Sequence, residues 1–202
     1  EAESLCLAWI PDHAMRRWEV LAQWAREQGW TRGVEVGVKR GPTFLYMLSH
    51  CPQLTWIGVD LFEARPGLDA EGGESNVDIN LPMQEVHLRL VSRKYGGRGI
   101  LIKGESTAVA QTFQEASLDC VFIDGDHREQ AVRADILAWR PKIKLGGILC
   151  GHDYGPKAIK GNERPGVKLA VDALCLGATV HADSVWAWPV VKVGLDRLTL
   201  GG

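Results

Sequence analysis

The chain alternates short apolar runs with stretches whose apolar residues recur at helical spacing. Five runs have the length and composition of buried strands and end at glycine or polar residues: residues 34–36, 55–60, 99–103, 118–123 and 148–150. Stretches with a helical period lie around them: residues 12–28, 42–51, 83–94, 128–140 and 165–176. This alternation predicts parallel strands that are joined by helices.

The pattern changes near the C-terminal end of the chain. Two further predicted strands, residues 178–182 and 185–193, follow each other too closely for a helix to join them. Such a pair is expected to be antiparallel. The sequence therefore predicts an α/β fold with a doubly wound sheet of seven strands. The sheet should be mostly parallel with a final antiparallel strand, and an N-terminal helix is added to it.

Composition narrows the class of partner. The 202 residues are expected to form one domain, residues 1–202, large enough to bury a sheet with helices on both faces. With 23 basic and 25 acidic residues the net charge is −2, so nothing favours nucleic acid or a membrane surface, and a small-molecule acceptor is expected. Five scattered cysteines, no bilayer-length apolar run and no signal-peptide pattern predict a cytoplasmic protein with free thiols.

Two segments stand apart from the regular pattern. Residues 1–30 hold four of the eight tryptophans and form a predicted helical cap. Its aromatic face either packs on the core or covers the active site or an interface of a homo-oligomer. Residues 63–82 are rich in glycine, asparagine and proline, and a loop of this length is typically a lid or a substrate loop.

The turn after the first strand is the first candidate site. Glu35, Gly37 and Gly41 precede a helix that begins with Pro42 and Thr43. The glycines let the backbone approach a ligand closely, and the free amides at the helix start suit a nucleotide or a carboxylate. Glu35 suits an ammonium group, and S-adenosylmethionine carries both an ammonium and a carboxylate. The pattern Glu-x-Gly-x-x-x-Gly differs from the dinucleotide fingerprint and resembles the first motif of class I S-adenosylmethionine-dependent methyltransferases.

Two further strand ends extend this candidate cofactor site. Asp60 is placed to accept hydrogen bonds from both ribose hydroxyls, or else it caps a loop. Glu105 and Ser106 follow a strand where related methyltransferases place side chains near the adenine, with a helix cap as the alternative. The resemblance implies a Rossmann-like three-layer sandwich that binds S-adenosylmethionine through Glu35, Gly37, Gly41, Thr43, Asp60, Glu105, Ser106 and Asp124.

Polar motifs follow the next two strands. Asp124 begins the motif Asp-Gly-Asp-His, and His152 and Asp153 lie within the motif Gly-His-Asp-Tyr. Because adjacent parallel strands lie about 4.8 Å apart, these side chains can converge on one small object. Asp124, His152 and Asp153 are therefore predicted ligands of a divalent cation. Carboxylates suit Mg²⁺, whereas the imidazole favours Mn²⁺, Fe²⁺ or Zn²⁺.

These motifs resemble those of metal-dependent O-methyltransferases typified by catechol O-methyltransferase. In that family one strand supplies an aspartate, which matches Asp124, and the next supplies an acidic or amide pair, which matches His152 and Asp153. Two histidines depart from the pattern. His152 stands where the family has a carboxylate, which bears on the metal and its identity, and His127 stands where the family has its catalytic lysine, which changes the base but not its capacity to act as one. The chain is closer to a subgroup of small methyltransferases that carry both motifs, some of which modify sugars or natural products. That resemblance covers roughly residues 30–190.

The resemblance implies methyl transfer to an oxygen of a small hydroxylated molecule, such as a sugar, a catechol or a natural product. His127 is the predicted general base, and Asp124 and His152 complete the predicted catalytic group. A bound cation would lower the pKa of the acceptor hydroxyl. Two alternatives stay open: a metal-independent methyltransferase with a histidine base, and a non-catalytic nucleotide-binding domain. Either histidine can instead be a capping or supporting residue, and Asp126 is expected to cap the following helix.

Overall fold

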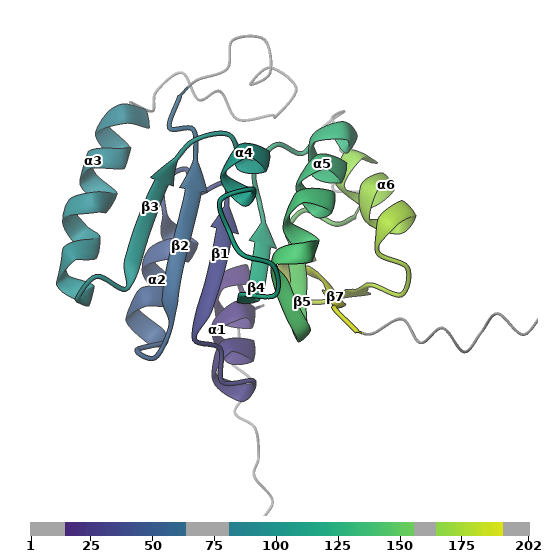
Figure 1. Cartoon of the computed structure of the whole chain (residues 1–202), viewed down its shortest axis with the longest axis horizontal. Coiled ribbons are helices and arrows are strands. Elements are labelled where there is room, and N and C mark those ends of the chain that lie inside the picture. Colours follow the sequence, from purple (N-terminus) through teal and green to yellow (C-terminus); the bar gives the residue numbers. More distant parts are fainter. Residues whose placement is uncertain (1–14, 64–80, 156–164, 192–202) are drawn as a thin grey trace, which may run out of the picture.

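The computed structural model describes residues 15–63, 81–155 and 165–191. They form one seven-stranded sheet with the strand order β3-β2-β1-β4-β5-β7-β6 (Figure 1). The strands are β1 (Arg32–Val36), β2 (Thr55–Asp60), β3 (Gly99–Lys103), β4 (Leu118–Ile123), β5 (Ile143–Gly151), β6 (Thr179–Val180) and β7 (Trp186–Pro189). The first five strands are parallel, and β7 runs antiparallel to both β5 and β6. The predicted fold class is confirmed.

Helices cover both faces of the sheet and complete a three-layer sandwich (Figure 1). They are α1 (Arg17–Glu27), α2 (Pro42–His50), α3 (Leu81–Ser92), α4 (Ser106–Ala110), α5 (Glu129–Trp139) and α6 (Pro165–Leu174). Short 3₁₀ turns follow α3 and α5 as η2 (Arg93–Tyr95) and η3 (Arg140–Lys142), and a third, η4 (Ala182–Ser184), joins β6 to β7. Helices therefore connect most of the consecutive strands, so that the carboxyl ends of the parallel strands lie at the same edge of the sheet.

Side-chain alternation along the central strands explains how both faces become apolar. Val121 and Ile123 of β4 belong to the core cluster that packs against α4, α5 and α6. Cys120, which precedes Val121, and Phe122, which follows it, belong to the cluster that packs against α1, α2 and α3. A strand buried on both faces reads as a continuous apolar run. The sequence pattern reflects this double burial.

The helix boundaries differ from the prediction in three places. Helix α1 begins at Arg17, and the start of the helix predicted over residues 12–28 lies outside the described residues. Helix α3 begins at Leu81, so the predicted loop over residues 63–82 is too long at its C-terminal end, and residues 64–80 lie outside the described ranges. Helix α4 was not predicted, because its five residues are too few to show a helical period.

The last strands also differ from the prediction. Strand β5 begins at Ile143 rather than at residue 148, and its pairing with β4 shifts register between Leu118 and Cys120. Strand β6 is shorter than the predicted strand over residues 178–182, because η4 begins at Ala182, and β7 covers only residues 186–189 of the predicted strand over residues 185–193. The antiparallel relation of β6 and β7 is confirmed.

Two further expectations concern cysteines and membrane spans. The four cysteines within the described ranges, Cys51, Cys120, Cys150 and Cys175, are buried free thiols, as expected. Among the described helices, none combines the length and apolar character that a bilayer crossing requires.

Candidate active site at the carboxyl edge of the sheet

Register places the predicted site residues side by side at one edge of the sheet. Val36 of β1 pairs with Ile123 of β4, and Ile123 pairs with Gly151 of β5. The residues that follow these strands are therefore neighbours. The backbone amide of Asp124 donates to the carbonyl of Val36 at 2.8 Å, and the amide of His152 donates to the carbonyl of Ile123 at 3.1 Å. The predicted convergence of the two polar motifs is confirmed.

Three side chains gather at this point: Asp124, His152 and Asp153. Each offers one ligand atom, and these atoms all lie within 4.8 Å of one another. The Nδ1 atom of His152 lies 3.6 Å from Oδ1 of Asp124 and 3.3 Å from Oδ2 of Asp153. Asp153 has a φ angle of 58°, which is uncommon for a residue other than glycine and turns its side chain at the strand end. Two carboxylates and an imidazole at this spacing fit one divalent cation.

His127 borders the same group from the N-terminal side of α5. Its Nε2 atom lies 3.1 Å from Oδ2 of Asp153 and 3.6 Å from Oδ1 of Asp124. The side chain is about a quarter exposed, at 25%. Both carboxylates therefore lie beside the ring nitrogen of His127. Asp126, in contrast, accepts hydrogen bonds from the amide and the guanidinium of Arg128. Arg128 is the N-cap residue of α5, so these bonds hold the residue before the helix, and capping of the helix itself by Asp126 stays a prediction.

His152 is the most enclosed member of the group, with 8% of its surface exposed. Burial acts to lower the pKa of its imidazole, but the hydrogen bond with Asp153 and the charges of Asp124 and Asp153 outweigh that effect. The pKa of His152 therefore lies above its ordinary value of 6.5. The carboxylates thus attract positive charge to this point, which either a proton or a metal cation can supply.

Arg17 is a site residue that sequence reasoning missed. It is the first residue of α1, and its Nε atom donates to the hydroxyl of Thr43 at 3.3 Å. The same atom lies 3.3 Å from Oδ2 of Asp124. The remainder of α1 packs on the core through Leu21 and Ala22. The N-terminal helix therefore packs on the core and also borders the site. No sequence pattern around Arg17 predicts its contact with the site.

Asp183 of η4 is the second residue that sequence reasoning missed. Its Oδ2 atom accepts a hydrogen bond from the backbone amide of Arg17 at 3.0 Å and lies 3.6 Å from Nε2 of His152. Strand β7 is antiparallel to β5, so the segment that precedes β7 lies at the edge where β5 ends. Asp183 reaches the site because the chain turns back between β6 and β7, and it lies in no recognisable sequence motif.

Asp60 organises the glycine turn from the end of β2. Its Oδ2 atom accepts hydrogen bonds from the amides of Val38 and Lys39, both at 2.8 Å, and Oδ1 accepts one from the amide of Phe62 at 2.7 Å. Lys39 has a φ angle of 49°, a conformation that these bonds help to hold. The loop-capping role weighed for Asp60 is confirmed, and its contact with ribose hydroxyls stays a prediction.

The reason given for the glycines needs correction. A Cβ atom at Gly37 would lie 2.3 Å from the carbonyl oxygen of Asp124, and one at Gly41 would lie 2.4 Å from the side chain of Leu88. Both glycines also have positive φ angles, 87° and 76°. Protein atoms, rather than a ligand, occupy the space that a side chain would need. A larger residue at Gly37 is therefore expected to disturb the sheet edge as well as cofactor binding.

Glu35 lies beneath the glycine turn and is 1% exposed. Its Oε2 atom accepts a hydrogen bond from Nε1 of Trp56 at 3.0 Å. Burial raises the pKa of Glu35 from 4.5 to about 8, and the bond from Trp56 only partly offsets that rise. The carboxyl group is therefore neutral at neutral pH in this structure, and its contact with the ammonium group of the cofactor stays a prediction.

The last two predicted cofactor residues follow β3. Glu105 precedes α4 and makes no side-chain cap bond to it. The Oγ atom of Ser106 accepts a hydrogen bond from Nε1 of Trp139 at 2.8 Å, which connects α4 to α5. Both residues lie at the carboxyl edge, where β3 ends, and their contact with an adenine stays a prediction.

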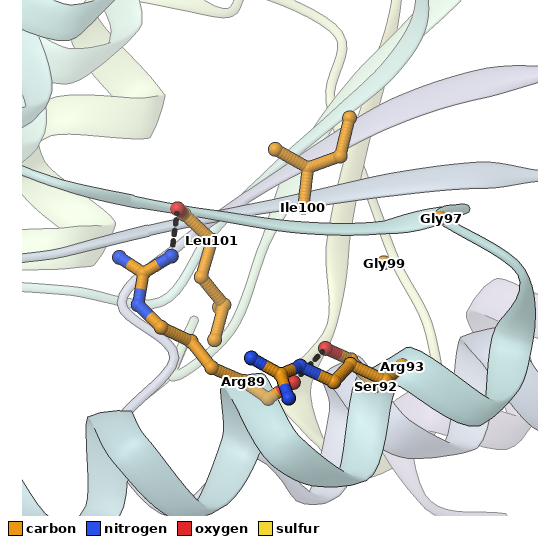
Figure 2. A pocket seen from close by; sticks show the side chains of 7 residues that line it. All are labelled: Arg89, Ser92, Arg93, Gly97, Gly99, Ile100 and Leu101. Atoms are coloured by element: carbon orange, nitrogen blue, oxygen red, sulfur yellow. Dashed lines mark hydrogen bonds between the residues drawn. The ribbon is translucent and has the colours of Figure 1, made fainter.

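A separate hollow lies away from this edge (Figure 2). It is formed between α3 and the outer side of β3 and includes Arg89, Arg93 and Ile100 among its lining residues. The guanidinium of Arg89 donates to the carbonyl of Leu101 at 3.0 Å, so this side chain satisfies part of the exposed sheet edge. No predicted site residue lines the hollow.

The fold is a doubly wound α/β sheet, and acid and histidine side chains gather at the carboxyl edge, where such sheets generally bind ligands. The family described as "Methyltransferase domain" matches residues 34–154, which is more than half of the chain. The chain belongs to this family and is an S-adenosylmethionine-dependent methyltransferase. This assignment favours an enzyme over a non-catalytic nucleotide-binding domain.

Solved structures with the same fold agree with this assignment. The cofactor-bound protein Rv0187 from MTB has a TM-score of 0.62 at 15% identity, over 90% of this chain and 84% of that chain. An O-methyltransferase family protein from Burkholderia thailandensis has a TM-score of 0.58 at 14% identity, over 86% and 55%. A TDP-rhamnose 3′-O-methyltransferase of calicheamicin biosynthesis has a TM-score of 0.53 at 17% identity, over 86% and 80%. At these identities the likeness shows a shared fold.

Proposed function

We propose that this methyltransferase transfers the methyl group to a hydroxyl oxygen of a small molecule, with a divalent cation held by Asp124, His152 and Asp153. The observation that carries the proposal is the convergence of these three side chains from two neighbouring strand ends. Two of the structural neighbours are named as O-methyltransferases, and one of them acts on a sugar nucleotide. Sugars, catechols and hydroxylated natural products are therefore the acceptor classes to test.

The chain's own residues provide the positioning that methyl transfer requires. The amides at the start of α2 and the turn held by Asp60 would bind the methyl donor. His127 would take the proton from the acceptor hydroxyl, because its Nε2 atom lies beside Asp153 and Asp124 at the same strand ends. Alignment of the donor methyl group with the acceptor oxygen supplies much of the remaining acceleration. A cation, when bound, lowers the pKa of the acceptor hydroxyl and fixes its position.

A metal-independent mechanism is the second candidate, and one observation favours it. The guanidinium of Arg17 already lies 3.3 Å from Asp124, and His127 and His152 each lie near two carboxylates. The charges at the site are thus partly balanced by protein cations alone. In this mechanism His127 is the base, and the acidic residues only orient the histidines.

Chelation separates the two mechanisms. Formation of S-adenosylhomocysteine is measured with catechols and sugar nucleotides as acceptors, first in the presence of a chelator and then after addition of Mg²⁺, Mn²⁺ or Zn²⁺. The proposal predicts loss of activity on chelation and recovery with at least one of these ions. Asp124→Asn should abolish the metal response, whereas Asp126→Asn, which removes the carboxylate bonded to Arg128, should keep it. Full activity in chelator would favour the histidine-only mechanism.

A further inference from the structure

The two ring nitrogens of His152 face different surroundings. Nδ1 faces Asp124 and Asp153, the two carboxylates of the proposed cation site. Nε2 is buried and has no hydrogen-bond partner within the part of the chain that the structure describes. The acidic group on that side is Asp183, whose Oδ2 atom lies 3.6 Å from Nε2. A buried ring nitrogen this close to a carboxylate points to a specific pairing, because an unmade buried hydrogen bond is costly.

Asp183 is held in this place from two directions. The backbone amide of Arg17 donates to its Oδ2 atom at 3.0 Å, and the amide of Tyr154 donates to the carbonyl of Ser184 at 3.0 Å. The φ angles of Asp183 and Ser184 are 54° and 57°, so η4 is built from two residues in the left-handed region. Such strain persists where the surroundings enforce it, and it is concentrated at functional sites. The carboxylate of Asp183 thus has a fixed position beside the imidazole.

We propose that Asp183 is a positioning residue, which accepts the Nε2–H of His152 when a cation is bound and thereby keeps the Nδ1 lone pair directed at that cation between Asp124 and Asp153. The proposal rests on the proposed function, because it assigns the purpose of that lone pair to the cation. A histidine that binds a metal through one nitrogen generally donates its other N–H to a carboxylate, carbonyl or water, which fixes the tautomer and makes the ligand more basic. Asp183 would supply that partner from a segment outside both polar motifs.

A purely structural role is the competing explanation. Asp183 also connects η4 to the first residue of α1 through the amide of Arg17. If that were its whole role, its removal would lower the stability of the fold and leave the tautomer of His152 unchanged. The two roles therefore differ in what happens to the imidazole.

The test uses two substitutions of Asp183 in the full chain. Asp183→Gly removes the carboxylate and suits the positive φ angle, whereas Asp183→Asn keeps an acceptor oxygen and removes only the charge. Glu115→Gln, which removes an exposed carboxylate at the opposite end of β4, is the matched control. Nitrogen-15 NMR of the histidine rings under alkaline conditions reports the tautomer, and Mn²⁺ affinity is measured by electron paramagnetic resonance without donor or acceptor.

The proposal predicts that, in the wild-type protein saturated with diamagnetic Zn²⁺, the NMR spectra show the proton of His152 on Nε2. In Asp183→Gly the population moves toward the Nδ1–H form, and the dissociation constant for Mn²⁺ rises about 10- to 100-fold. Asp183→Asn should fall between Asp183→Gly and the control, since it restores part of the interaction.

An unchanged tautomer and an unchanged Mn²⁺ affinity in a folded Asp183→Gly variant would overturn the proposal and leave the cation site standing. A wild-type protein that binds no Mn²⁺ would overturn the cation part of the proposed function. The proposed role of Asp183, which rests on that cation, would then fall with it.

Discussion

The buried carboxyl group of Glu35 gives a quantitative prediction about stability and pH. Glu35 is 1% exposed, and its pKa in the folded protein is about 8, against an ordinary value of 4.5. Each pKa unit corresponds to about 1.4 kcal/mol, so this gap amounts to a contribution on the order of a few kcal/mol. Between pH 4.5 and about pH 8 the folded state keeps the proton of Glu35, whereas the unfolded state has lost it. The contribution of Glu35 to the free energy of unfolding should therefore fall as the pH rises through this range and stay constant above it.

The variant Glu35→Gln isolates this contribution. Glutamine is neutral at every pH and still offers an oxygen to the indole N–H of Trp56, which Glu35 binds at 3.0 Å. Wild type and variant should have similar free energies of unfolding near pH 5. Near pH 8 the variant should be more stable by about a few kcal/mol, which is the size that the pKa difference of Glu35 implies. Equilibrium unfolding in urea at a series of pH values measures the difference.

Comparison of the two profiles also removes the titration of other groups, since these are common to both proteins. Glu115→Gln, a substitution at an exposed carboxylate, should leave the profile unchanged. Parallel profiles for wild type and Glu35→Gln would refute the reasoning, because they would mean that Glu35 ionises in the folded protein as it does in the unfolded chain.

Two further predictions concern the donor and the base. Asp60→Ala should weaken binding of S-adenosylmethionine by roughly 1–3 kcal/mol, because it removes the acceptor of three backbone amides and of the predicted ribose bonds. Calorimetric titration measures this change. An unchanged dissociation constant in a folded variant would contradict the prediction. His127→Ala should lower the turnover number by about 10²–10⁴-fold and leave the affinity for the methyl donor nearly intact. Steady-state rates with a confirmed acceptor measure the loss. A loss of only a few-fold would mean that His127 is a supporting residue and not the base.

Local pattern was sufficient to predict the sheet and the two converging motifs. The strands around Val121 and Cys150 are buried on both faces, so their apolar runs are visible in the sequence, and parallel register then places Asp124 beside His152. The metal-ligand group predicted from this placement is spatially close in the structure. These predictions succeeded because period and register are properties of short segments.

The remaining features depend on contacts between distant segments. Arg17 and Asp183 reach the site only because α1 and η4 meet at its border, and neither lies in a motif. The requirement for glycine at position 37 comes from the carbonyl of Asp124 on another strand, so the ligand-based explanation for Gly37 was wrong. Loop capping by Asp60 was weighed from the sequence, but the amides that it binds, those of Val38 and Lys39, lie in the turn after another strand.

The proposed function requires that Asp124, His152 and Asp153 hold one divalent cation beside the methyl donor. Anomalous diffraction from crystals grown with Mn²⁺ and S-adenosylhomocysteine would locate that cation. We expect one anomalous peak within coordination distance of both carboxylates and of Nδ1 of His152, which lies 3.6 Å from Asp124 and 3.3 Å from Asp153. A difference map with the cofactor product bound and no anomalous peak among these three side chains would contradict the claim.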